Sequence, residues 1–227
     1  MKNFKRIGFT LSEVLITLSI VAVVATLVLP GFIKDMKMRA NMALLQSTVV
    51  NLSDVVQQDL IRTRAKTLED ANVYNNPKLF LTKNFDYVKE GQNIFRSVND
   101  NGEYVAYTFS HMIAPSVAGG STTPTSQVLL KNGVYIGIYK SSMFRYFVVD
   151  LNGPEEPNII GIDYFVLDIA PEDDLENGIR MGDVGAFQEY TVKESSELKT
   201  LCLNGSGQAC YALVERSGFD PNYIDKF

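Results

Sequence analysis

The sequence predicts an α+β protein in which a long N-terminal α-helix packs on an antiparallel β-sheet of about four strands. An apolar run opens the chain, and apolar residues then recur at spacings of three and four as far as Arg62, which is typical of a helix. Segments rich in β-branched and aromatic residues, separated by turn residues, follow between about residues 103 and 169. A length of 227 residues suits one such helix with one globular domain.

The apolar run extends from Phe9 to Leu29 and holds 21 residues with a single charge, Glu13. As a helix it covers roughly 30 Å, the thickness of the hydrocarbon core of a bilayer. The residues before it include Lys2, Lys5 and Arg6 and no acid, which favours a cytoplasmic N-terminus. We therefore expect a single membrane-spanning helix whose remaining chain lies on the other side.

Glu13 is unusual because a carboxylate at mid-bilayer costs about 2.5–3.5 kcal/mol and marks a functional position. Its candidate partners within the chain are Lys5 and Arg6. If the chain were cut after Gly8, the new α-amino group of Phe9 would be another. The same amine on a neighbouring copy could pair with Glu13 equally well, which would make the acid a docking device between identical helices.

The segment Gly8-Phe9-Thr10-Leu11-Ser12-Glu13, followed by the apolar run and Pro30, resembles the class III signals of type IV pilins and of type II secretion pseudopilins. The resemblance implies that a prepilin peptidase cleaves after Gly8 and N-methylates Phe9. It also implies that Glu13 pairs with a neighbour's N-terminus during filament assembly. The resemblance is specific over residues 5–30 and only architectural beyond them.

Two other interpretations of the N-terminus are a cleaved secretory signal, with Val23-Val24-Ala25 as its cleavage site, and an uncleaved single-pass anchor. Neither explains an acid in the apolar segment directly after a Gly-Phe step. The resemblance implies a subunit of a type IV pilus or of a secretion pseudopilus, held in the bacterial inner membrane with an exported head. Its partners would be copies of itself or other pilins, prepilin peptidase and a membrane assembly platform. The alternatives are a minor subunit whose head binds a secreted protein, a surface or DNA, and a simple membrane-anchored exported domain.

Beyond the apolar run the chain is predicted to continue as an amphipathic helix, with a kink at Pro30 and Gly31 because proline removes a helical hydrogen bond. The apolar face of this later part is expected to pack on the sheet. It comprises Met42, Leu45, Val49, Leu52, Val56 and Leu60. The predicted organisation is a leader peptide (1–8), a transmembrane and filament-core helix (9–33), an amphipathic helix (34–62) and a globular head (63–227).

The head begins with a loop of residues 63–101 that contains short helical turns near 77–84. Strands are expected at 103–110, 128–139, 143–150 and 164–169. Within the second of these, Asn132-Gly133 predicts a hairpin with a type I′ turn, which needs positive φ at both residues. The acidic stretch from Ala170 to Asp183 is expected to be a solvated surface.

Asp150, Asn152 and Asp163 lie in a turn-rich segment whose oxygens suit a calcium ion. Some pseudopilins hold calcium in a loop after the sheet, so the resemblance supports this weakly. The alternative is a connector in which Asp and Asn side chains cap their own backbone. The twelve-residue calcium-loop pattern is absent, because the twelfth place from Asp150 is Gly161 and not glutamate.

Cys202 and Cys210 are the only cysteines, and an even pair in an exported region predicts a disulfide, the alternative being two free thiols. The disulfide would fasten a C-terminal tail that ends with an exposed Tyr223 and Phe227. Disulfide-bounded C-terminal regions are also common in the family that the N-terminus resembles.

Composition argues against two classes of function. Removing the three basic side chains of the leader from a formal net charge of −5 leaves −8, which disfavours nucleic acid as a ligand. The sole histidine, His111, and the absence of common catalytic motifs predict that the chain is not an enzyme.

Overall fold

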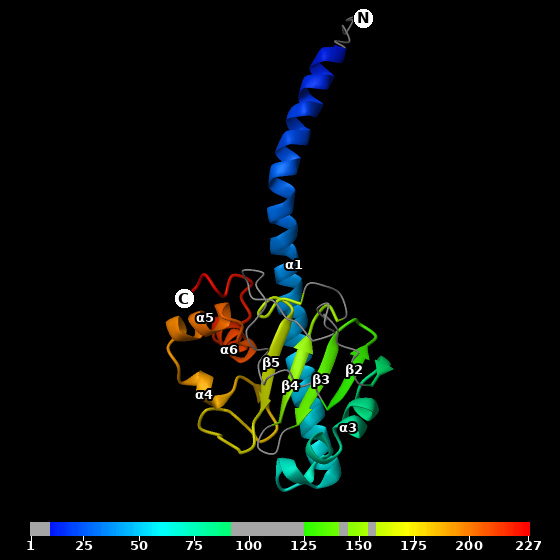
Figure 1. Ribbon diagram of the computed structural model, residues 1–227, viewed down its shortest axis with the longest axis vertical. Coiled ribbons are helices and arrows are strands. Elements are labelled where there is room, and N and C mark those ends of the chain that lie inside the picture. Colours follow the sequence, from blue (N-terminus) through cyan, green and yellow to red (C-terminus); the bar gives the residue numbers. More distant parts are fainter. Residues whose placement is uncertain (1–9, 92–124, 141–144, 154–157) are drawn as a thin grey trace, which may run out of the picture. The chain divides into compact units, whose positions relative to one another are not determined.

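A computed structural model describes residues 10–91, 125–140, 145–153 and 158–227. The chain forms two compact units, Met1–Ala40 and Asn41–Phe227, and the first helix runs through both. The helices are α1 (Leu11–Thr63), α2 (Asn72–Asn75), α3 (Pro77–Asn84), α4 (Gln188–Thr191), α5 (Ser195–Leu203) and α6 (Gly207–Ser217), with a 3₁₀ turn at Leu68–Asp70 (Figure 1). The strands are β1 (Tyr87–Glu90), β2 (Ser126–Leu130), β3 (Tyr135–Lys140), β4 (Arg145–Asp150), β5 (Tyr164–Ile169) and β6 (Val184–Gly185).

Helix α1 is 53 residues long and continues through Pro30 without interruption (Figure 1). Pro30 therefore lies inside a helix, and the kink at Pro30 and Gly31 stays a prediction. The strand expected at 103–110 and the histidine His111 lie outside the described residues.

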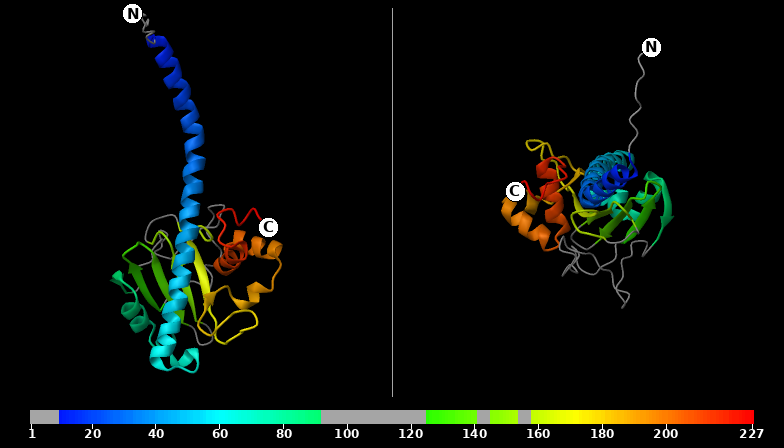
Figure 2. Two further views of the ribbon diagram at one scale, coloured as in Figure 1. Left: turned by 180° about the vertical axis from the view of Figure 1, so that it is seen from behind. Right: turned by 90° about the horizontal axis from the view of Figure 1, so that it is seen from above.

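Within the second unit, α1 crosses one face of the sheet (Figures 1 and 2). The predicted apolar face is confirmed, because all six of its side chains are buried: Met42, Leu45, Val49, Leu52, Val56 and Leu60. Their spacing places them on one stripe of the helix, as packing against a single layer requires.

The described strands form one antiparallel sheet in the order β1-β2-β3-β4-β5-β6. The α+β class is confirmed, with six strands in the described residues where about four were expected. Strand β1 lies in a segment that was interpreted as a loop, since Tyr87–Glu90 is short and largely exposed and lacks a clear alternating pattern. Strand β6 has only two residues, too few to give a sequence signal.

The β2–β3 hairpin forms where Asn132-Gly133 predicted it, but its turn is not type I′. Gly133 has a φ of 88°, whereas Asn132 has a negative φ. The Gly133 N–H donates to the Leu130 carbonyl at 3.1 Å, so Lys131 and Asn132 form a type I turn that a left-handed glycine follows. Of the predicted pair Asn132-Gly133, only Gly133 therefore has the left-handed conformation.

The disulfide between Cys202 and Cys210 is present and joins α5 to α6, with the two Cα atoms 4.6 Å apart. Helix α6 lies close to β5, since a Cβ at Gly207 would be 2.9 Å from Val166 Cγ2. The expectation of an exposed Tyr223 is wrong: it is 1% exposed, and its hydroxyl donates to the Gly161 carbonyl at 2.8 Å. The tail is thus anchored by a buried ring as well as by the disulfide.

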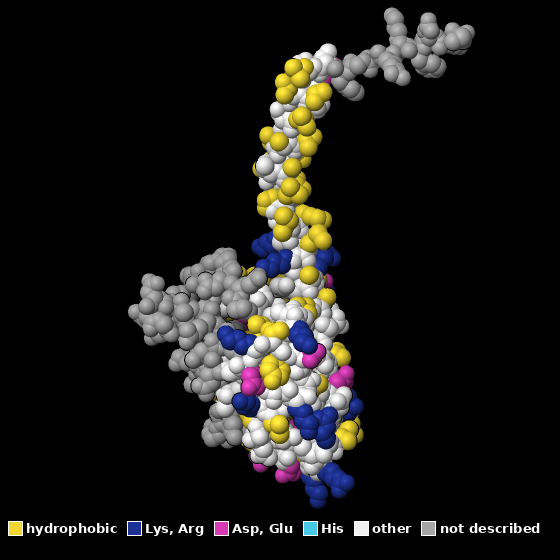
Figure 3. All heavy atoms as spheres, turned by 90° about the vertical axis from the view of Figure 1, so that its right-hand side faces the viewer, with side chains coloured by type: hydrophobic (Ala, Val, Ile, Leu, Met, Phe, Trp, Pro, Cys, Tyr) yellow, Lys and Arg dark blue, Asp and Glu magenta, His cyan; other side chains and the backbone are white. Residues whose placement is uncertain are grey.

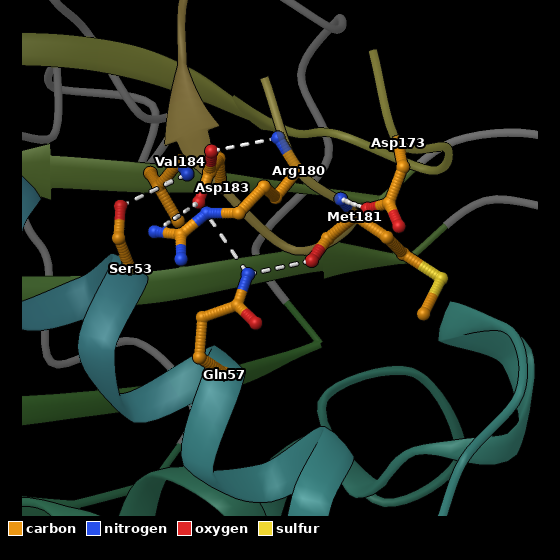
Figure 4. A network of polar contacts seen from close by, with 7 residues as sticks. All are labelled: Ser53, Gln57, Asp173, Arg180, Met181, Asp183 and Val184. Atoms are coloured by element: carbon orange, nitrogen blue, oxygen red, sulfur yellow. Dashed lines mark hydrogen bonds and ion pairs between the residues drawn. The ribbon is translucent and has the colours of Figure 1, made fainter. Parts of the chain in front are cut away.

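The acidic stretch after β5 is more than a solvated surface, because its second half is bonded to α1 (Figure 4). Gln57 Nε2 donates to the Met181 carbonyl at 2.6 Å, and the Val184 N–H donates to Ser53 Oγ at 3.0 Å. Between these bonds the backbone at Gly182 approaches α1 so closely that a Cβ would lie 2.7 Å from Leu60 Cδ1.

Replacing Gly182 by alanine is expected to destabilise the head, because the new Cβ meets the buried face of α1 and Gly182 has a φ of 85°. The matched control is Gly178→Ala, where φ is 74° and nothing lies within 4 Å of the added Cβ. The control is expected to cost only the backbone strain, about 1–2 kcal/mol, and G182A a further ~1–3 kcal/mol for overpacking. Urea unfolding of the two variants in detergent measures the difference, and equal losses would contradict the close packing.

Candidate functional site

The first described turn of α1 holds Glu13 in a reciprocal set of hydrogen bonds with Thr10. Glu13 Oε2 accepts from the Thr10 N–H and from the Thr10 hydroxyl, both at 2.8 Å. In return, Thr10 Oγ1 accepts from the Glu13 N–H at 3.3 Å. This is a capping box, in which residues three apart satisfy each other's backbone donors at a helix start. The pattern Thr-x-x-Glu is visible in the sequence, but Thr10 was not predicted as a functional residue because Glu13 was interpreted only as a membrane-buried charge.

Both capping bonds go to the same oxygen of Glu13. Among the described residues the other oxygen, Oε1, accepts no hydrogen bond. The carboxylate can therefore cap its own helix through Oε2 and still accept a donor from elsewhere through Oε1. Gly8 and Phe9, the predicted cleavage and methylation residues, lie outside the described residues.

The part of α1 that carries Glu13 is apolar over the face that Figure 3 shows, and consecutive exposed residues such as Val14, Leu15 and Ile16 extend the apolar surface around the helix. Leu11 is 78% exposed and Leu27 77%, and large apolar side chains between Leu11 and Met36 are exposed in the same way. Within the described residues, α1 is the one helix long and apolar enough to cross a membrane. A contiguous apolar surface of this extent is not stable in water, so it needs lipid or other helices around it.

The predicted calcium residues lie at the end of β4 and just before β5. Asp150 and Asp163 are 0% and 3% exposed, and burial together with the charge of Asp163 raises the pKa of Asp150 well above its usual range. Asp150 Oδ1 accepts from the N–H groups of Asn152 and Gly153, each at 3.1 Å. Asp163 Oδ1 accepts from the Ile159 N–H at 2.6 Å. The structure therefore shows the backbone-capping role that was the alternative, while it also brings the two carboxylates near each other.

Calcium at these residues remains a proposal. Asp150, Asn152 and Asp163 offer oxygen donors of the right kind, and a cation would offset the repulsion between two buried carboxylates. Within the described residues no group of three or more His, Cys, Asp or Glu side chains is arranged to hold a metal, so carbonyl and amide oxygens would have to complete the shell.

If calcium binds there, a chelator is expected to lower the melting temperature of the wild-type protein by about 5 °C, because the ion stabilises only the folded state. Added calcium restores the melting temperature, and the variant Asp163→Asn responds to neither treatment. A wild-type melting temperature that is the same with and without chelator would contradict the proposal.

A second cluster, which the sequence analysis did not predict, combines aromatic rings with a half-buried acid. Tyr139, Tyr146 and Asp168 are directly opposite one another on β3, β4 and β5 and so share one face of the sheet. The two tyrosine rings are stacked with centroids 4.7 Å apart, and Phe187 lies 6.0 Å from Tyr146. Burial raises the pKa of Asp168 to about 6, although its bond from the Ile169 N–H at 2.9 Å opposes the shift.

This shift gives a pH dependence of stability. The folded state holds a proton on Asp168 more tightly than the unfolded state does, so stability falls as pH rises from about 4 to about 6 and then levels off. Asp168→Asn removes the titrating group and keeps an acceptor for the Ile169 N–H. The variant is expected to be more stable than the wild type by on the order of 2 kcal/mol at pH 8, and equally stable at pH 3.5. Urea unfolding at both values measures this, and Asp225→Asn, at an exposed acid, is the control that should show no such gain.

Residues 3–29 match the family model described as the prokaryotic N-terminal methylation motif, the class III signal of type IV pilins and pseudopilins. No curated protein and no solved structure matches the chain significantly. The motif implies processing by prepilin peptidase and assembly into filaments, and it points to a structural subunit and not to an enzyme. Together with the apolar helix it fits a membrane-anchored exported protein.

Proposed function

Because the N-terminal methylation motif (residues 3–29) overlaps the exposed apolar part of α1 (Leu11 to Met36), we propose that this protein is a filament subunit, either of a type IV pilus or of a type II secretion pseudopilus. Its head unit would be carried on the outside of the filament and its apolar helices would form the core. The observation that supports this most is Glu13, a carboxylate in an apolar helix that keeps one oxygen available after capping its own N-terminus.

The proposed assembly step begins with cleavage between Gly8 and Phe9. Cleavage places a positively charged amine next to Thr10, at the start of the helix. A neighbour's amine can then donate to Glu13 Oε1 while Oε2 keeps its bonds to Thr10. An ion pair that is excluded from water is strong, and an unpaired carboxylate in the same place is costly, so the pairing fixes the axial register between subunits.

The proposed orientation places the N-terminus in the cytoplasm, where prepilin peptidase of the resembled family acts. The leader's basic residues are consistent with this orientation. The other flank of the apolar helix carries an equal number of basic side chains, so the count of Lys and Arg alone does not decide the orientation. The leader residues are Lys2, Lys5 and Arg6, and those of the other flank are Lys34, Lys37 and Arg39. Protease protection in spheroplasts tests the orientation, since an exported head is expected to be digested from outside.

Two substitutions separate the charge of Glu13 from its capping role. Glutamine can also complete a capping box, so Glu13→Gln removes the charge and keeps the helix start. Thr10→Val removes the hydroxyl and keeps the charge. We expect E13Q to reduce filament yield at least ~100-fold, since losing one buried charge pair costs about 3–5 kcal/mol. T10V is expected to reduce the yield only a few-fold.

Sheared filaments, quantified against membrane-inserted subunit in the same cells, provide the measurement. Intact mass of the mature protein provides the processing control, because both variants should begin at Phe9.

Normal filaments from E13Q would contradict charge pairing. Native protein that begins elsewhere than Phe9, with no filaments, would favour a membrane-anchored exported domain. Normal filaments in cells that lack this subunit would favour a minor subunit with a binding head.

A further inference from the structure

Three basic side chains follow the apolar part of α1 and lie within the first unit. Lys34, Lys37 and Arg39 are all exposed, and we call them the basic collar. Figure 3 shows Lys and Arg side chains on both sides of the helix directly beyond its apolar stretch. The only acid among them is Asp35, whose carboxylate pairs with Arg39 at 3.0 Å. The collar therefore carries a net positive charge.

The collar spans about 200° around the helix axis and does not form a narrow stripe. At 100° per residue, Lys37 lies about 60° from Lys34 around the axis, and Arg39 about 140° from it on the other side. A helix packed against one protein surface would present its charges on one face. Charges spread over more than half of the circumference instead suit an environment that contacts the helix on several sides.

The axial position of the collar matches the headgroup layer of a bilayer. Leu11 to Ile33 is a run of 23 residues, roughly 34 Å long as a helix, which fills the hydrocarbon core of about 30 Å. Lys34 to Arg39 then extends through the next several ångströms, where the phosphates lie. The apolar stems of Lys and Arg cover hydrocarbon while their charged ends reach those phosphates.

We propose that the basic collar binds the phosphate groups of anionic phospholipids in the leaflet nearer the head, and so holds the unassembled subunit at one depth in the membrane. This inference depends on the proposed insertion of α1 in a bilayer. Each Lys or Arg near an anionic surface attracts it measurably, and the attraction is screened by salt.

The test uses the full chain reconstituted in vesicles of phosphatidylcholine with phosphatidylglycerol. Electron paramagnetic resonance with spin-labelled lipids measures which lipid contacts the protein. The wild type is expected to prefer spin-labelled phosphatidylglycerol over spin-labelled phosphatidylcholine about 5-fold, and the preference should fall in high salt. The triple variant Lys34→Gln, Lys37→Gln, Arg39→Gln is expected to show no preference.

The matched control is Lys66→Gln, Lys83→Gln, Lys89→Gln, which removes the same charge from exposed positions outside the first unit and should keep the preference. Flotation of the vesicles reports insertion separately. Protein that floats with the vesicles but shows no preference, or a control variant that loses the preference equally, would overturn the lipid site and leave the proposed function intact. Protein that does not float would overturn both.

Discussion

The structure depends on one constraint, which is that α1 is apolar and yet carries a carboxylate near its start. Neither water nor hydrocarbon alone is favourable for both the apolar side chains and the carboxylate. The side chains from Leu11 to Met36 need to leave water, whereas Glu13 needs donors or a positive charge. The capping box with Thr10 meets part of this need within the chain. The remaining oxygen of Glu13 can still accept a donor from outside the chain, which is the property that the proposed polymerising element would require.

The same helix meets different requirements in its two halves. The first half is apolar on all sides, as lipid or a bundle of identical helices demands, and the second half is apolar on one stripe only. The head holds that stripe at several places along its length. Near the helix end the buried carboxylate of Asp59 accepts from the Val73 N–H at 3.0 Å and from Asn72 Nδ2 at 2.9 Å, and so begins α2. The chain that follows α1 is thus connected back to the end of this helix by hydrogen bonds.

The sequence predicted the features that have a local physical signal. The stripe from Met42 to Leu60, the helix at 77–84, the strand at 164–169 and the disulfide all follow from periodicity, composition or pairing of cysteines.

The features that the sequence did not predict depend on distant contacts. Gly182 gives no sign in the sequence that α1 lies against it, and Tyr223 is in a polar tail yet is buried by Gly161 and its surroundings. Tyr139, Tyr146 and Asp168 come from three strands, so only the register of the sheet reveals that they are neighbours. Thr10 is different, since its Thr-x-x-Glu pattern was readable and was overlooked.

The basic collar and Glu13 also constrain each other. Lys34, the first residue of the collar, follows Glu13 by 21 residues. This separation is roughly 32 Å along a helix, which is close to the full thickness of the hydrocarbon core. If phosphates hold the collar in one headgroup layer, Glu13 lies at the opposite boundary of the core and not at its centre. The carboxylate of an unassembled subunit can then stay hydrated, so the cost of inserting the helix is well below the mid-bilayer value. In the proposed assembly, movement of the helix from the membrane into a filament would remove that hydration, and Glu13 would then need an amine from a neighbour. The ion pair would therefore favour the assembled state specifically, because only assembly removes Glu13 from water.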